Sequence, residues 1–184
     1  RVNIRQASHY QSLRFHHHTF TNNLELSFGT MRKGEKAWVE GEMIVAPNSV
    51  LPATWVFEAE RDFAHQIGRR DAEGWSVRVG DTPGRYMNYG PYTTVIAGGS
   101  RTATFRLLVD NSTADNLRLL TLDVYDATAG KVLASRDVTR RQFGKAFAYQ
   151  DFSLPFVAVA GHRLEFRTFW HNYAYVRQDK VSVR

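Results

Sequence analysis

The segment TWVFEAERDF (residues 54–63) places two carboxylates, Glu58 and Glu60, two positions apart directly after a run of large hydrophobic side chains. The hydrophobic run predicts a strand. Because successive side chains of a strand point to opposite faces, we expect Glu58 and Glu60 to share one face. Neighbouring carboxylates repel each other, and each raises the pKa of the other. The pattern therefore requires a neutralising partner, which could be a cation, an arginine such as Arg61 or Arg69, or water.

A third carboxylate, Asp179, stands where the chain enters the last expected strand, QDKVSVR. If the first and last strands of the fold are neighbours, Asp179 approaches Glu58 and Glu60. Three carboxylates with nearby backbone carbonyls form an oxygen-only ligand set, which suits Ca²⁺ rather than zinc or copper. The alternative is that Glu58 and Glu60 face solvent and pair with arginine. From the spacing alone this alternative is favoured, because such pairs are common in exposed strands.

Two aromatic stretches, RYMNYGPY (85–92) and FWHNYAYVRQD (169–179), carry groups that could bind a sugar. Sugar recognition needs flat apolar surfaces together with a few placed polar groups. The alternative is that part of these rings fill the core, and strand alternation favours an inward orientation for Tyr86 or Tyr92. The candidate ligand-binding residues of these two stretches are Asn88, Tyr89, Tyr92, Trp170, His171, Asn172 and Tyr173.

Arginines gather in the segment SRDVTRRQFGK (135–145), which includes Arg140. Guanidinium groups bind carboxylates through two parallel hydrogen bonds. An acidic sugar, such as a uronic acid, is therefore a candidate ligand, and Arg140 is a candidate contact. The alternative for any single arginine is a solvated surface position.

Short segments typical of strands recur from residue 53 onward and are separated by turn residues. TATFRLLVD (102–110) and LLTLDVYDA (119–127) alternate apolar and polar side chains, as half-buried strands do. Eight or nine such strands in roughly 130 residues predict an all-β fold, an antiparallel β-sandwich of the jelly-roll type.

The first 52 residues have a different organisation. LELSFG (24–29) and AWVEGEMIVA (37–46) flank a turn-like segment and predict a β-hairpin, whereas residues 1–23 read as an irregular or partly helical lead-in. PNSVLP (47–52) holds two of the five prolines and predicts a boundary. We therefore expect an N-terminal β extension, residues 1–52, followed by the sandwich domain, residues 53–184.

The composition narrows the function classes. Of the 184 residues, 43% are hydrophobic and 13% aromatic, which is typical of a folded β-rich domain with rings available for recognition. The absence of cysteine excludes disulfides, thiolate metal sites and a cysteine nucleophile. The net charge of +6 favours acidic partners. Three consecutive histidines (16–18) cannot all face one ion from a strand, so we predict a surface loop there and no zinc.

The order of four motifs resembles a carbohydrate-binding module of the galactose-binding-like β-sandwich type, closest to families six and thirty-five. The resemblance covers about residues 53–184. The motifs are FEAE (57–60), GW (74–75), YMNYGPYTTVIAGG (86–99) leading into TATFRLLVD, and a closing DKVSV (179–183).

This resemblance implies a structural Ca²⁺ held by Glu58, Glu60 and Asp179. It also implies a sugar site in which a late-loop asparagine, here best matched by Asn172, works with loop aromatics such as Trp75 or Tyr89. Some modules of family thirty-five recognise uronic acids. The resemblance does not extend to residues 1–52.

The leading hypothesis is a non-catalytic, calcium-containing module that binds a polysaccharide. We expect it to be fused to other domains of a longer chain and to act outside the cell or at its surface. A β-sandwich glycoside hydrolase or polysaccharide lyase is the main alternative, although no catalytic carboxylate pair or Ser-His-Asp signature stands out. A nucleic-acid partner is not expected, because the basic residues are scattered and carry no recognisable motif. Membrane insertion is not expected, because no apolar run approaches a spanning length. A further hypothesis is a structural or assembly domain in which residues 1–52 pair with a partner chain.

Overall fold

A computed structural model describes the backbone of residues 2–7, 10–17, 22–28 and 39–43, and both backbone and side chains of residues 54–184. The chain divides into two compact units, residues 1–51 and 52–184.

Four strands form two antiparallel pairs in the N-terminal unit. The lead-in was expected to be irregular, and this expectation is wrong, because residues 2–7 and 10–17 are strands. The expected hairpin between residues 24–29 and 37–46 is also wrong, because each segment pairs with an earlier strand. Leu13 and Phe15 alternate in the sequence and lie in register opposite leucines of the partner strand. The pairs are β1 (Val2–Ala7) with β4 (Val39–Met43), and β2 (Tyr10–His17) with β3 (Asn22–Phe28). Residues 29–38 and 44–53, which include the predicted boundary at PNSVLP, lie outside the described residues.

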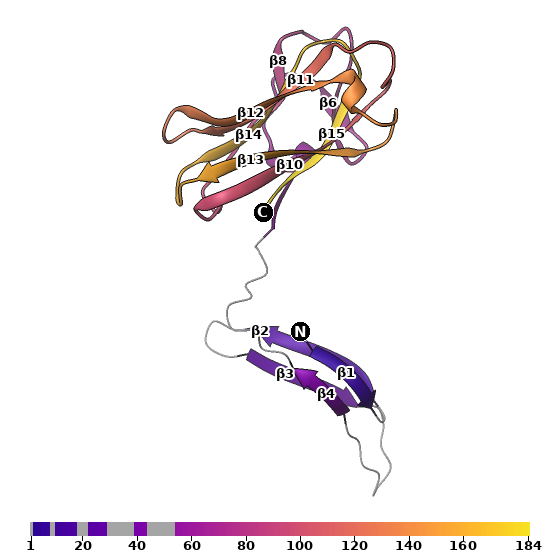
Figure 1. The fold of residues 1–184 in the computed structure, drawn as a ribbon, viewed down its shortest axis with the longest axis vertical. Coiled ribbons are helices and arrows are strands. Elements are labelled where there is room, and N and C mark those ends of the chain that lie inside the picture. The colour runs from indigo at the N-terminus through magenta and orange to yellow at the C-terminus, as the bar shows by residue number, and fades with distance from the viewer. Residues whose placement is uncertain (1, 8–9, 18–21, 29–38, 44–53) are drawn as a thin grey trace, which may run out of the picture. The chain divides into compact units, whose positions relative to one another are not determined.

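The second unit is a sandwich of two antiparallel sheets, which confirms the predicted fold class (Figure 1). The six-stranded sheet runs in the order β13 (Gln150–Ala158), β10 (Gly99–Val109), β15 (Val176–Val183), β7 (Gly74–Val77) and β6 (Arg69–Asp71), and β5 (Trp55–Glu58) also pairs with β15. The five-stranded sheet runs in the order β12 (Lys131–Thr139), β11 (Arg118–Asp126), β14 (Leu164–Trp170) and β8 (Arg85–Asn88), and β9 (Pro91–Thr93) also pairs with β14.

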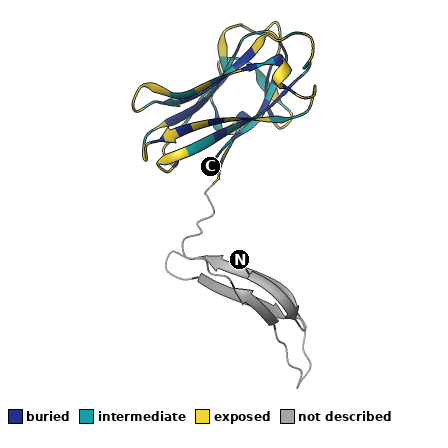
Figure 2. Cartoon of the chain, viewed as in Figure 1, coloured by how far each residue is buried: buried dark blue, intermediate teal, exposed yellow. Residues whose placement is uncertain are grey.

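The hydrophobic core lies between the two sheets. Buried and exposed positions alternate along β13, as the dark blue and yellow segments of Figure 2 show. The same period directs Phe105, Leu122 and Phe166 inward, and none of these three side chains is accessible to solvent. Each fully buried side chain of this size contributes about 1.5–3 kcal/mol through the hydrophobic effect. The alternation that predicted the strands is therefore the pattern that forms the core.

The first and last strands of the sandwich are neighbours, as expected. β5 pairs with β15, and Glu58 lies opposite Lys180. The strand ends at Glu58, however, and a helical turn, α1 (Ala59–Asp62), follows. A carboxylate oxygen of Asp62 accepts a hydrogen bond from the backbone N–H of Glu58 at 2.7 Å. The expectation that Glu58 and Glu60 share one strand face is therefore wrong, because Glu60 already belongs to the turn.

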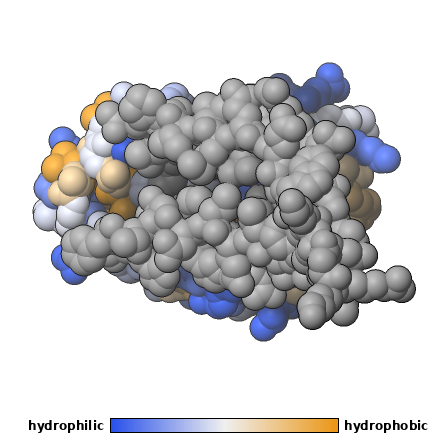
Figure 3. All heavy atoms as spheres, turned by 90° about the horizontal axis from the view of Figure 1, so that it is seen from below, coloured by the Kyte–Doolittle hydropathy of each residue, from blue (hydrophilic) through white to orange (hydrophobic). Residues whose placement is uncertain are grey.

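The visible surface of the sandwich is mixed in character. In the end-on view of Figure 3, hydrophobic side chains form small areas bordered by hydrophilic ones. In the part of the chain that the structure describes, no helix has the length and apolar character needed to cross a membrane.

Candidate functional site

Polar and aromatic side chains stand in register on the outer face of the five-stranded sheet. Alternation along β14 turns Phe166 and Thr168 inward and leaves the residues between them on the outer face. Across β11 and β14, Thr121 lies opposite Phe169, Asp123 opposite Arg167, and Tyr125 opposite Glu165. On β8, Tyr86 lies opposite Phe169. We call this surface the tyrosine–arginine face and define it by Tyr86, Tyr92, Thr121, Asp123, Tyr125, Glu165, Arg167 and Phe169.

Arg167 is the centre of this face. Its Nε donates to Asp123 Oδ1 at 2.7 Å, and its Nη2 donates to Asp123 Oδ2 at 3.2 Å. Its guanidinium carbon lies 4.1 Å from the ring centroid of Tyr125 and 5.2 Å from that of Tyr86. A guanidinium is attracted to the negative faces of aromatic rings, and a two-bond pair with a carboxylate fixes its plane. The arginine is therefore held in one orientation between two tyrosine rings.

The two carboxyl groups of the face are largely removed from water. Asp123 is 6% exposed and Glu165 5% exposed. Burial raises the pKa of both groups, and the positive charge of Arg167 opposes the rise. The face therefore holds one guanidinium for two shielded carboxyl groups, and each of these groups can accept hydrogen bonds.

Tyrosines form the rim of the face beside β8 and β9. The ring of Tyr86 meets Phe169 edge-to-face at 5.3 Å between centroids. Tyr92 is 45% exposed and follows Pro91, which lies opposite Glu165. Burial raises the pKa of Tyr92, and the nearby carboxylate of Glu165 raises it further. The phenol of Tyr92 and the carboxyl group of Glu165 are therefore close enough to act on one ligand.

The face combines what saccharide binding requires. Flat rings can lie against the C–H surfaces of a sugar, and fixed planar polar groups can hydrogen-bond its hydroxyls. The polar groups are held by protein contacts before any ligand arrives, so that little ordering is needed on binding.

Three of the sequence-predicted ligand residues lie at this face: Tyr92 is part of it, and Tyr89 and His171 border it. The ring of Tyr89 lies 6.4 Å from that of Tyr86. His171 Nε2 lies 2.9 Å from Thr121 Oγ1, and its ring meets Phe169 at 5.1 Å. Burial lowers the pKa of His171, and Arg118 lowers it further. Tyr92 was one of two residues expected to point inward, whereas it is exposed.

Three other sequence-predicted ligand residues are packed within the fold. Trp170 and Asn88 are fully buried, and the indole N–H of Trp170 donates to the Ala174 carbonyl at 3.1 Å. Trp75 is half-buried. Its ring is stacked on His65 at 3.5 Å between centroids, and its N–H donates to the Ile67 carbonyl at 2.8 Å. Trp170 and Asn88 therefore cannot contact a ligand in this fold, because inward-facing strand positions place both between the sheets.

Arg140 is an internal anchor rather than a surface contact. Its side chain is 6% exposed and donates to Asp115 Oδ1 at 2.8 Å, to the Asn111 carbonyl at 3.0 Å and to the Tyr173 carbonyl. All three nitrogens of its guanidinium group donate to acceptors in two loops. The predicted sugar contact is therefore corrected to a structural role. Tyr173 is 50% exposed, and the buried Oδ1 of Asn172 has no hydrogen-bond partner among the described residues.

The predicted metal ligands lie on β5 (Glu58), α1 (Glu60) and β15 (Asp179), and two of them, Glu58 and Asp179, lie near the same lysine. Lys180 Nζ lies 3.8 Å from Glu58 Oε1 and 3.5 Å from Asp179 Oδ2. Arg106 also pairs with Asp179, at 3.2 Å. Glu60 Oε2 is buried and has no hydrogen-bond partner within residues 54–184. In this arrangement Lys180 neutralises the acids. Within residues 54–184, no three acidic or histidine side chains are grouped closely enough to hold a metal ion.

Six residues of the face were not proposed from the sequence. The signal was present, because LLTLDVYDA and LEFRTFW alternate and every second side chain is polar or aromatic. Alternation identifies the outward side chains of a strand but does not identify the strand beside it. These residues are Thr121, Asp123, Tyr125, Glu165, Arg167 and Phe169.

No protein-family model matches the sequence, and no curated protein matches it. The solved structures that it resembles include carbohydrate-binding modules of the β-sandwich type. The C-terminal CBM6 of the laminarinase LamC from Zobellia galactanivorans is 13% identical, with 71% of this chain and 98% of that chain covered at a TM-score of 0.48. A carbohydrate-binding module of Cellvibrio mixtus lichenase 5A, solved with cellotriose, is 15% identical, with 72% and 96% covered at a TM-score of 0.48. The CBM22-1–GH10 modules of Clostridium thermocellum xylanase 10B, solved with xylohexaose, are 16% identical, with 71% and 24% covered at a TM-score of 0.36.

Proposed function

We propose that residues 54–184 form a non-catalytic module that binds a polysaccharide on the tyrosine–arginine face. The observation that carries this proposal is the placement of Arg167, which Asp123 fixes through two hydrogen bonds between the rings of Tyr86 and Tyr125. Oriented polar groups flanked by partly exposed rings suit a ligand with both hydroxyls and C–H surfaces.

Catalysis is the second candidate, because Asp123 and Glu165 share one face and burial raises the pKa of both. A hydrolase or lyase would use such groups for acid–base chemistry. Asp123, however, accepts both hydrogen bonds of the Arg167 fork, which favour its charged form and hold it in place. This arrangement suits an orienting group better than a proton carrier. New reducing ends or unsaturated products from a polysaccharide panel, abolished by Glu165→Gln, would establish an enzyme.

Two tyrosines of similar exposure provide the test of the binding face. Tyr92 is 45% exposed on the face, and Tyr173 is 50% exposed in the loop that Arg140 anchors. We expect Tyr92→Ala to weaken binding to the best polysaccharide of a panel about tenfold, as loss of a contact worth about 1.4 kcal/mol would. Tyr173→Ala serves as the matched control and should bind as wild type does, by isothermal titration calorimetry. Loss of binding in Tyr173→Ala alone would move the site to that loop.

The finer features of the function are also proposals. The net charge of +6 supports an acidic glycan such as a uronic-acid polymer. A binding module contributes most when it is fused to a domain that acts on the same polymer, so we propose a longer parent protein. Polysaccharides of this kind occur outside cells, which supports an extracellular or cell-surface location.

We propose in addition that Ca²⁺ binds where β5 and β15 meet, with Glu58, Glu60 and Asp179 as its carboxylate ligands. Support comes from the buried oxygen of Glu60, which has no partner in the part of the chain that the structure describes, and from the closeness of Glu58 and Asp179 to one ammonium group. When bound, the ion would supply the neutralising charge that Lys180 supplies in this structure. We expect calcium at a hundredfold excess over its dissociation constant to add about 2.7 kcal/mol to the free energy of unfolding. Identical melting curves in calcium and in chelator would contradict this proposal.

A further inference from the structure

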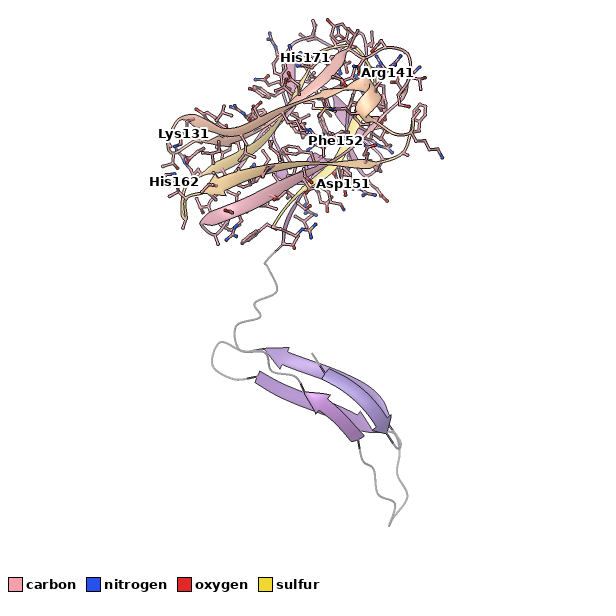
Figure 4. The ribbon with its side chains drawn as sticks, in the orientation of Figure 1. Lys131, Arg141, Asp151, Phe152, His162 and His171 are labelled. Atoms are coloured by element: carbon pink, nitrogen blue, oxygen red, sulfur yellow. The ribbon has the colours of Figure 1, made fainter. Side chains whose placement is uncertain are left out.

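A pocket of about 480 Å³ lies between the loop that follows β10 and the segment that follows β12. None of its lining residues belongs to the tyrosine–arginine face. Figure 4 places Arg141 at the end of the sandwich that is remote from Lys131 and His162. We call this site the Arg141 pocket, and its lining residues are Ser112, Thr113, Arg141, Phe143 and Gly144.

Arg141 differs from its neighbour Arg140 in what it contacts. The side chain of Arg140 is buried and bonded to two loops. Arg141 is exposed and forms no ion pair with any residue of the range 54–184. The charge of Arg141 lowers the pKa of Asp115, but the hydrogen bond that Asp115 accepts from Arg140 lowers it more. The guanidinium of Arg141 is therefore the uncommitted charge of this pocket.

Protein contacts fix the backbone on both sides of the pocket. The side-chain oxygen of Asn111 accepts the backbone N–H groups of Thr113 and Ala114, each at 2.9 Å. On the other side, Gln150 Oε1 accepts the Gly144 N–H at 2.8 Å. Between them, η1 (Arg140–Gln142) carries a capping box formed with Thr139. A pocket with walls fixed in this way loses little entropy when it binds a ligand.

The lining chemistry is that of an oxyanion site. A guanidinium binds a carboxylate or sulfate through two parallel hydrogen bonds, and the hydroxyl of Ser112 is a further donor. The hydroxyl of Thr113 donates to Asn111 Oδ1 at 3.5 Å. The side chain of Phe143 is almost completely buried, so it exposes little apolar surface to the pocket. An uncharged sugar would leave the guanidinium without a charged partner, whereas an anionic group would use the charge and the Ser112 hydroxyl together.

The tyrosine–arginine face is a poor site for the same anion. Its single guanidinium, on Arg167, is already paired with Asp123, and Glu165 adds a further carboxyl group. A polyanion would meet like charge there. If the glycan is acidic, its charge must be recognised elsewhere.

We infer that the Arg141 pocket binds the oxyanion of an acidic glycan, either the carboxylate of a uronic acid or a sulfate ester. This inference rests on the proposed glycan-binding function and assigns the charged part of the ligand to a site separate from the tyrosine–arginine face.

The test uses the full chain and three families of short oligosaccharides measured by calorimetry. The probes are oligogalacturonides, the same oligomers after reduction of their carboxyl groups to alcohols, and sulfated galactan fragments. Arg141→Gln removes the charge from the pocket. Arg163→Gln is the matched control, because Arg163 is also exposed and without an ion pair in residues 54–184, and follows His162 at the other end of the sandwich.

We expect Arg141→Gln to weaken binding of at least one anionic probe about tenfold, as loss of a charge-assisted hydrogen-bonded contact predicts. Binding of the carboxyl-reduced oligomers should not change, and Arg163→Gln should alter neither. The anionic probe that responds distinguishes carboxylate from sulfate. Equal losses of anionic-probe binding in the two variants, or no loss in Arg141→Gln, would overturn the inference. The proposed function would still stand in that case if the carboxyl-reduced oligomers bind. If none of the three families of oligosaccharides binds, both the inference and the proposed function are overturned.

Discussion

Replacing Arg140 with alanine should destabilise the sandwich strongly, although its neighbour Arg141 can be replaced at little cost. The Arg140 side chain is 6% exposed and bridges three acceptors: the carboxylate of Asp115 and the carbonyls of Asn111 and Tyr173. Truncation would remove all three hydrogen bonds. It would also leave the two carbonyls without this donor.

The magnitude follows from these contacts. A hydrogen bond to a charged group contributes about 1.5–3 kcal/mol. The Asp115 side chain is 35% exposed, so water would replace part of what it loses. Most of the lost stability therefore comes from the two carbonyls, which lose a charged hydrogen-bond donor. We expect Arg140→Ala to lower the free energy of unfolding by about 3 kcal/mol. For a domain of this size, such a loss lowers Tm by about 10 °C.

Differential scanning calorimetry of three variants measures this effect. Arg141→Ala is the matched control, because it removes the same charge from an exposed position and should change stability by less than about 0.5 kcal/mol. Arg140→Lys should fall between them, because an ammonium group cannot reproduce the guanidinium fork. Equal Tm values for Arg140→Ala and Arg141→Ala would refute the assignment of Arg140 as an anchor.

Two further predictions concern other buried groups. Burial pushes the pKa of Asp126 upward, but His162 at 2.7 Å and two backbone N–H groups hold it below its usual value. A carboxyl group with a depressed folded pKa contributes stability above its unfolded pKa and loses it as the pH falls. The stability advantage of wild type over Asp126→Asn should therefore shrink below about pH 4 in urea titrations, and a constant difference would contradict this. Trp170 is fully buried, so Trp170→Ala should lower the free energy of unfolding by about 3–5 kcal/mol, while a change as small as that of an exposed residue would place the ring outside the core.

The strands of the sandwich were predictable because their sequence period is local. TATFRLLVD and LLTLDVYDA show which side chains face the core, and they lie in β10 and β11. The predicted strand through FEAE was too long. The Asp62 carboxylate, which bonds the Glu58 backbone four residues earlier, favours a turn that the run of hydrophobic side chains did not indicate.

The N-terminal hairpin was mispredicted for a related reason. Both segments were recognised as strands, and their lengths and spacing suited a hairpin. The partner of each strand is nevertheless an earlier segment, β1 for β4 and β2 for β3. Alternation alone leaves the choice of partner open, because any strand with a matching apolar face can satisfy it.

The candidate site was likewise predictable only in part. Aromatic loops were visible in the sequence, and Tyr89, Tyr92 and His171 do lie at the face. Trp170 and Asn88 occur in the same stretches but point into the core, because the strands turn every second side chain inward.

Sequence patterning was sufficient to establish the class of the fold and the alternation of side chains along the long strands, because both follow from a two-residue period and from turn residues. It did not establish which side chains of the aromatic stretches face outward, since Trp170 and Asn88 point into the core. Tertiary structure decided the rest. The register of β11 against β14 joined Asp123 to Arg167, and loop packing buried Arg140 while leaving Arg141 at the surface. Those outcomes depend on contacts between segments far apart in the chain, which no local pattern encodes.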